Sequence, residues 1–131
     1  MDYYFLTLLK NISFDDAIKK TKEALKIEGF GVLTEIDMKT TLKEKLDVDF
    51  YNYKILGACN PTFAYKAIQN EDKIGTMLPC NVIVQERVNG IIEVAAVNPE
   101  ASMQAIKNPE LIGVSKEVTK KLKKVIQQLT L

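Results

Sequence analysis

The chain has 131 residues, of which 47% are apolar and 27% are charged. This composition is typical of a globular protein and excludes an intrinsically disordered chain. With 18 basic and 17 acidic residues the net charge is only +1, so no global field draws the chain to nucleic acid or to an anionic membrane. We expect a single domain over residues 1–131, and neither of those two partners.

The residue types that are missing also limit the chemistry. Histidine is absent, so the chain lacks the usual proton shuttle near neutral pH and the commonest metal ligand. Its two cysteines, Cys59 and Cys80, are too far apart for the Cys-x-x-Cys spacing of a zinc site, and the sequence predicts no metal site. The apolar run at residues 3–9 is too short to span a membrane. With no export signal visible, the expected location is the reducing cytoplasm.

Strands and helices alternate in the first part of the chain. Residues 3–9 are aromatic and branched without a breaker, which predicts a strand. Ser13 is an N-cap, and apolar side chains at three- and four-residue steps then predict a helix that Gly29 ends. The next patterns predict a strand, a short helix and a third strand, at residues 30–36, 38–46 and 51–58.

Three of the four prolines follow an asparagine. Asparagine is a preferred N-cap, and proline fits the first helical position because its missing N–H would be unpaired there. Asn60-Pro61 therefore predicts the start of a helix, and Asn98-Pro99 predicts the start of a short one. In the C-terminal region Ser115 is the expected N-cap of the last helix, whose apolar side chains recur from Val118 to Leu129.

Asn89-Gly90 separates two apolar-rich runs, at residues 80–88 and 91–97. Both residues accept the positive φ angles of a type I′ turn, so this pair predicts a hairpin. Glu86 and Glu93 lie on either side of the turn and are expected to face each other, where two acids can raise one pKa. A solvated strand face is the simpler interpretation of these acids. Strands joined partly by helices and partly by a hairpin predict an α+β fold: a mixed, mostly antiparallel sheet of about five strands with helices packed on one face.

The two cysteines raise a question of chemistry. Cys59 precedes a predicted helix N-terminus, whose N–H groups and dipole lower a thiol pKa. Cys80 begins an apolar strand, where loss of solvent keeps a thiol protonated. If the two strands are antiparallel, both sulfurs lie at one edge of the sheet, and if they are parallel the sulfurs lie a strand length apart. Thiol chemistry and structural packing therefore both stay open.

The small-residue loop at residues 57–61 opens a helix, which is a general geometry for holding a small anionic ligand. It lacks the glycine-rich pattern and the lysine of a phosphate-binding loop, so no nucleotide site is predicted. Helix capping is the simpler interpretation of the loop. An anionic ligand stays an expectation.

Residues 56–61 read Leu-Gly-Ala-Cys-Asn-Pro, and Gly75 is followed by Leu-Pro-Cys-Asn at residues 78–81 and an apolar strand with a glutamate. These motifs resemble the domain of unknown function 302 family, whose members share a Cys-Asn-Pro, a Gly-x-x-Leu-Pro-Cys and that strand. The resemblance implies a compact α+β domain of bacteria and archaea, often homodimeric, with no established activity. It makes the matching positions the candidate site: Cys59, Asn60, Pro61, Pro79, Cys80 and Glu86.

Two functions fit these patterns. The first is a small-ligand-binding or interaction domain that forms a homodimer through its sheet or helices, with a cleft near Cys59, Asn60 and Cys80. The second is a thiol redox or sulfur-transfer protein, with Cys59 as the nucleophile and Cys80 as the resolving partner. The sequence names no cofactor and leaves open whether the protein is an enzyme.

Overall fold

The computed structural model describes residues 1–130, which form one five-stranded sheet with helices. The strands lie in the spatial order β1-β5-β4-β3-β2, and every neighbouring pair is antiparallel. Their bounds are β1 (Tyr4–Leu9), β2 (Gly31–Asp37), β3 (Tyr53–Cys59), β4 (Cys80–Glu86) and β5 (Ile92–Val97). The predicted α+β fold with five strands is confirmed, and its sheet is wholly antiparallel.

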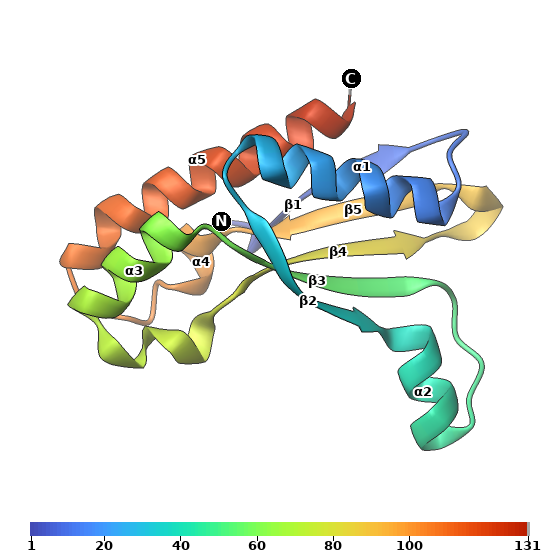
Figure 1. Cartoon of the computed structure of the whole chain (residues 1–131), viewed down its shortest axis with the longest axis horizontal. Coiled ribbons are helices and arrows are strands. Elements are labelled where there is room, and N and C mark those ends of the chain that lie inside the picture. Colours follow the sequence, from blue (N-terminus) through green and yellow to red (C-terminus); the bar gives the residue numbers. More distant parts are fainter. Residues whose placement is uncertain (131) are drawn as a thin grey trace.

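The helices divide into a layer on the sheet and groups at its two ends (Figure 1). The layer consists of α1 (Phe14–Ile27) and α5 (Glu110–Thr130), which pack against each other and cover one face. At one end of the sheet lie α3 (Pro61–Asn70), α4 (Pro99–Ser102) and the 3₁₀ segment η1 (Asp72–Met77). At the other end α2 (Met38–Leu46) projects from the sheet with no buried residue. None of the helices in residues 1–130 combines the length and apolarity needed to cross a membrane.

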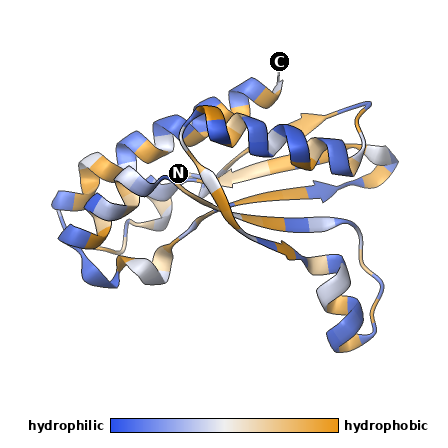
Figure 2. Cartoon of the chain, viewed as in Figure 1, coloured by the Kyte–Doolittle hydropathy of each residue, from blue (hydrophilic) through white to orange (hydrophobic). Residues whose placement is uncertain are grey.

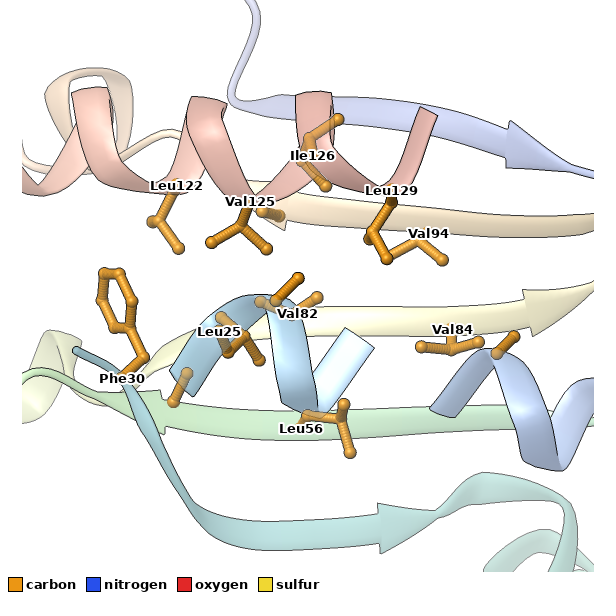
Figure 3. Packing of buried hydrophobic residues seen from close by; sticks show 14 of the residues in the cluster. Leu25, Phe30, Leu56, Val82, Val84, Val94, Leu122, Val125, Ile126 and Leu129 are labelled. Atoms are coloured by element: carbon orange, nitrogen blue, oxygen red, sulfur yellow. The ribbon is translucent and has the colours of Figure 1, made fainter. Parts of the chain in front are cut away.

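The main core fills the space between the helical layer and the sheet (Figure 3). Leu25 of α1 and Leu122 of α5 are fully buried there, opposite Leu56 and Val82 of the sheet. Figure 2 shows the reason in the sequence, because the strands are mostly hydrophobic while α1 and α5 carry both hydrophobic and hydrophilic residues. Removing these apolar side chains from water is the main stabilising term for the fold.

Local signals in the sequence set several of the observed boundaries. Ser13 Oγ accepts a hydrogen bond from Asp16 N at the start of α1, and Gly29 follows the end of that helix with φ +87°. Asn89 and Gly90 have φ values of 66° and 72°, and the predicted hairpin joins β4 to β5. Its loop is the three residues Val88–Gly90 and not a two-residue type I′ turn, because Glu86 pairs with Ile92. These residues act through their own backbone geometry, which is why a short window of sequence suffices to predict them.

Two predictions about the C-terminal half are wrong. The last helix begins at Glu110 and not after Ser115, because Asn108 Oδ1 accepts a hydrogen bond from Glu110 N and starts the helix nearly two turns earlier. Glu86 and Glu93 do not face each other, because Glu86 pairs with Ile92 and Glu93 pairs with Gln85. The alternation of a strand therefore puts the two acids on opposite faces of the sheet.

The face of the sheet that lies opposite α1 and α5 is called the open face below. Paired residues form an apolar row across all five strands of this face: Leu6, Ala95, Ile83, Ile55 and Ile36. At the two edges of the row, Leu6 is 43% exposed and Ile36 is 44% exposed. Between these edges Ala95 is buried, and Ile83 and Ile55 are half-buried. Exposed apolar side chains at the surface of a sheet mark a region that a partner covers in many proteins.

Candidate functional site

The antiparallel pairing of β3 and β4 brings the two cysteine segments together. Ala58 and Cys80 are direct partners in the register, so the end of β3 and the start of β4 lie at the same edge of the sheet. Of the two strand directions that the sequence left open, the structure therefore has the antiparallel one, for which both sulfurs were expected at one edge of the sheet. Both cysteines are free thiols, and no disulfide joins them.

A pocket of about 310 Å³ opens at this edge, and it is called the rim pocket below. Its walls come from the ends of β3 and β4, from one face of α3, and from α4 and the first half of α5. The small side chains of Ala58 and Ala67 lie buried at its inner wall, while Leu33 and Ile68 are exposed at its mouth. Elements far apart in the sequence therefore build one concave site, as is usual for ligand pockets.

The lining of the rim pocket is almost wholly apolar. Within residues 1–130, no Lys, Arg, Asp or Glu lines it, and its polar groups are the Asn60 amide, the Ser115 hydroxyl and the two thiols. The Ser115 hydroxyl donates to the carbonyl oxygen of Ile112, so its hydrogen is not available to a ligand. Such a pocket favours an apolar ligand and offers few polar contacts for fixing it.

Four of the six candidate residues line the rim pocket: Cys59, Asn60, Pro79 and Cys80. Pro61 is the first residue of α3 and is exposed beside the pocket. Glu86 ends β4, roughly 20 Å from Cys80 at the usual rise of an extended strand. There it accepts a hydrogen bond from Asn52 Nδ2 at 2.9 Å. The structure therefore brings the two cysteine motifs together and leaves Glu86 at the far end of the sheet.

Asn60 departs from the behaviour of the other Asn-Pro pairs. Asn98 Oδ1 accepts from Glu100 N and Asn108 Oδ1 accepts from Glu110 N, so both cap their helices. The Asn60 side chain makes no such bond to α3, and its Nδ2 instead donates to the Glu28 carbonyl oxygen at 3.3 Å. The helix does begin at Pro61 as predicted, but the expected side-chain cap is absent.

Burial controls the chemistry of Cys80. The removal of this thiol from water raises its pKa from an ordinary value of 9.0 to about 11, and the nearby Cys59 thiol adds to the shift. Cys80 is therefore a neutral thiol at physiological pH, which weighs against its ready attack on a disulfide.

Alkylation rates test this state of Cys80. We expect iodoacetamide to modify Cys80 slowly at pH 8, with a rate that rises about tenfold per pH unit and levels off only near pH 11, because the thiolate is the reacting form. Mass spectrometry after quenching at each pH measures the two cysteines separately, and the urea-unfolded chain is the control. The same shift lowers stability as pH rises above 9, because the unfolded thiol ionises first. Equal rates for folded and unfolded Cys80 at pH 8 contradict the assignment.

Several pocket residues were not predicted from the sequence. Met103 follows α4, and Val114 and Val118 belong to α5, so all three come well after the last candidate residue in the sequence. Their apolar spacing predicts burial, but it does not say whether the side chain meets the core or a pocket. The only local signal is the crowding of small residues around Ala58, Ala64 and Ala67, which leaves space that large neighbours do not fill.

Comparison with known proteins supports the architecture as a whole. The family model "Domain of unknown function DUF302" matches residues 6–129. The chain belongs to the DUF302 family. A similar solved structure is the uncharacterized conserved protein DUF302 from Bacillus stearothermophilus, with 25% sequence identity and a TM-score of 0.89. That match covers 98% of this chain and 99% of the other. The comparison with curated proteins gives no match.

Membership confirms the resemblance seen in the motifs of Cys59 and Cys80. In this DUF302 chain, most of the motif residues serve one place, the rim pocket. Gly57, a motif residue outside the pocket lining, packs closely against Pro79 where β3 and β4 meet. The motifs therefore carry both a packing role and a pocket role.

Proposed function

We propose that this DUF302 domain binds a small molecule in the rim pocket. The observation that carries the proposal is that residues from both cysteine motifs meet in one apolar pocket of about 310 Å³. Pockets of this size and lining are the usual sites for small ligands. The two free thiols fit the reducing cytoplasm in which we place the protein.

The thiol redox or sulfur-transfer alternative has less support. It needs Cys80 to exchange with a disulfide, and burial keeps that thiol protonated. An anionic ligand also has less support, because no basic side chain within residues 1–130 lines the pocket. Noncovalent binding of a ligand needs only the apolar lining and the volume of the pocket, and it does not require a reactive thiol.

Filling the pocket tests the proposal. A thermal-shift screen of the full chain with neutral fragments, anions and nucleotides is expected to give hits, because binding to the folded state alone raises its stability. Ala64→Phe places a ring in the pocket from α3 and is expected to weaken these hits at least about tenfold, since the ring occupies the ligand's space.

The matched control is Gln69→Phe, on the same helix but exposed and outside the pocket lining. This variant should bind the hits as the unmodified chain does. A screen without hits would contradict the proposal. Full binding by Ala64→Phe, with its fold intact by circular dichroism, would also contradict it, because the hits would then bind elsewhere.

A second proposal is that the protein is a homodimer, with the open face of one copy packed on the open face of another. Five strands of six or seven residues cover roughly 500 Å² in projection, at strand spacings of about 4.8 Å and a rise of about 3.3 Å. Projection understates accessible area, so this is comparable with the about 800 Å² per partner of a standard interface.

The chemistry of the open face favours a second copy of this chain. Its central row is apolar from Leu6 to Ile36, and Glu93 is the one charged side chain that strand alternation places on it within residues 1–130. Glu93 accepts a hydrogen bond from Gln85 Nε2, so its charge is partly satisfied within one chain. Arg87 reaches the same group, because its Nη1 donates to Gln85 Oε1, so the charges of Glu93 and Arg87 lie together at one end of the face. The apolar remainder is complementary to itself, and a net charge of +1 gives little repulsion between copies.

A further inference from the structure

We infer that the ligand of the rim pocket is a neutral, mainly apolar molecule with a hydrogen-bond donor, and that Asn60 Oδ1 accepts this bond. The inference rests on the proposed function and adds the chemical class of the ligand and the residue that selects it. Three features of the pocket carry it: the unused acceptor, the absence of charge and the volume.

The acceptor is available because the Asn60 side chain is held away from the usual capping bond. Its Nδ2 donates to the Glu28 carbonyl oxygen, and the backbone of Gly29 lies against it so closely that a Cβ there would come within 3.1 Å of Nδ2. Among residues 1–130, no group donates to Asn60 Oδ1, although the corresponding atoms of Asn98 and Asn108 cap helices. A fixed amide with an unused oxygen at a pocket is a hydrogen-bond acceptor in position for a ligand.

The charge of the ligand follows from the lining. No ionisable side chain other than the two thiols lines the pocket within residues 1–130, and the Cys80 thiol is neutral at pH 7. Transfer of an unpaired carboxylate or ammonium from water into such a pocket is strongly unfavourable. A neutral ligand carries no such penalty, and one good hydrogen bond suffices to orient it.

The volume limits the size of the ligand. An apolar protein cavity of about 150 Å³ accommodates benzene, so the rim pocket of about 310 Å³ has room for roughly two rings. Naphthalene derivatives are therefore suitable probes, because they offer one apolar body with different polar groups. 2-Naphthol carries a neutral donor, naphthalene carries none, and 2-naphthoate carries a negative charge.

The experiment compares the three probes by NMR titration of the full chain at pH 7. We expect 2-naphthol to bind about fivefold more tightly than naphthalene, which is the effect of one net hydrogen bond. We expect 2-naphthoate to bind at least about tenfold more weakly than naphthalene, because its charge must be desolvated. Ala64→Phe should weaken the binding of both neutral probes, which assigns it to the rim pocket.

Two substitutions of Asn60 test the acceptor. Asn60→Ala removes the oxygen and should abolish the preference for 2-naphthol while naphthalene still binds, so naphthalene reports an intact pocket. Asn60→Asp keeps an acceptor oxygen but loses the bond to Glu28 that holds the amide, so its preference should be smaller than that of the unmodified chain. A preference that survives at full size in Asn60→Ala would overturn the role of Asn60, and an undiminished one in Asn60→Asp would show that the bond to Glu28 does not position the acceptor.

The outcomes separate this inference from the function on which it rests. Tightest binding by 2-naphthoate overturns the neutral ligand class. If none of the three probes binds but the fragment screen gives hits that Ala64→Phe removes, the ligand class is wrong and the pocket still binds a ligand. If neither the probes nor the screen gives a hit, the proposed function fails, and the inference fails with it.

Discussion

Gly57→Ala is expected to lower the free energy of unfolding by about 1–3 kcal/mol, the usual range for overpacking at a well-packed position. Gly57 lies in β3 between neighbours on two sides. A Cβ at this position would overlap with Thr34 Oγ1 of β2 and would come within 2.8 Å of Pro79 Cγ. Because real Cβ atoms essentially never approach other heavy atoms so closely, both neighbours must move, and one of them is a rigid proline ring.

The control for this substitution is Gly113→Ala. Gly113 lies within α5, and a Cβ there would meet nothing within 4 Å. Alanine is the better helix former, so this variant should gain about 0.5–1 kcal/mol. Urea denaturation measures both changes. Adding Thr34→Ala to Gly57→Ala should recover part of the loss, since one of the two close contacts is removed. If the Gly57→Ala protein is as stable as the unmodified chain, the prediction is wrong, because Thr34 and Pro79 can then make room for the added methyl group without loss of stability.

Leu6→Lys is expected to convert the proposed homodimer into monomers. Leu6 begins the apolar row of the open face, and in a two-fold dimer each substitution occurs in both copies. Packing the open faces together would then bury two ammonium groups, and the carboxylate nearest in the register, Glu93, is already bonded to Gln85. The penalty for an unpaired buried charge of about 3 kcal/mol or more corresponds to a dissociation constant weaker by at least about 100-fold.

The position of Leu6 makes the test specific to association. It is 43% exposed in the single chain, so a lysine there can reach water and the fold of the monomer should persist. Ile27→Lys introduces the same charge on α1, where the side chain is 71% exposed on the other side of the sheet. Sedimentation velocity over a range of concentrations should show dimers for the unmodified chain and for Ile27→Lys, and monomers for Leu6→Lys. A monomeric unmodified chain at about 100 μM contradicts a standard-size dimer interface.

The sequence predicted what depends on a few neighbouring residues. The Ser13 cap, the Asn89-Gly90 turn and the start of α3 at Pro61 all involve backbone groups within a few positions of the residue that signals them. The prediction that β3 and β4 would bring Cys59 and Cys80 to one edge, if antiparallel, needed only the alternation of elements and the direction of two strands.

The predictions failed where the outcome depends on residues outside the local pattern. The Asn60 side chain makes no bond to its helix and instead donates through Nδ2 to the Glu28 carbonyl, thirty-two positions away, a contact that no local pattern signals. Ser115 does not begin the last helix because Asn108 begins it earlier, and α5 then continues through Gly113. The inner walls that α4 and α5 add to the rim pocket could not be read from apolar spacing, which is the same for a core side chain and a pocket side chain.

The irregularity in β2 adds a residue to the wall of the rim pocket. Val32 and Thr34 pair with the consecutive residues Ala58 and Gly57, so Leu33 is one residue more than the ladder uses. This extra leucine is 69% exposed, and it stands at the mouth of the rim pocket. A bulge bends its strand and interrupts the ladder, so a chain without the insertion would form the more regular sheet. The sheet does not need this residue for its pairing, so the bulge adds an apolar, water-exposed side chain to the surface that a ligand would meet at the rim pocket.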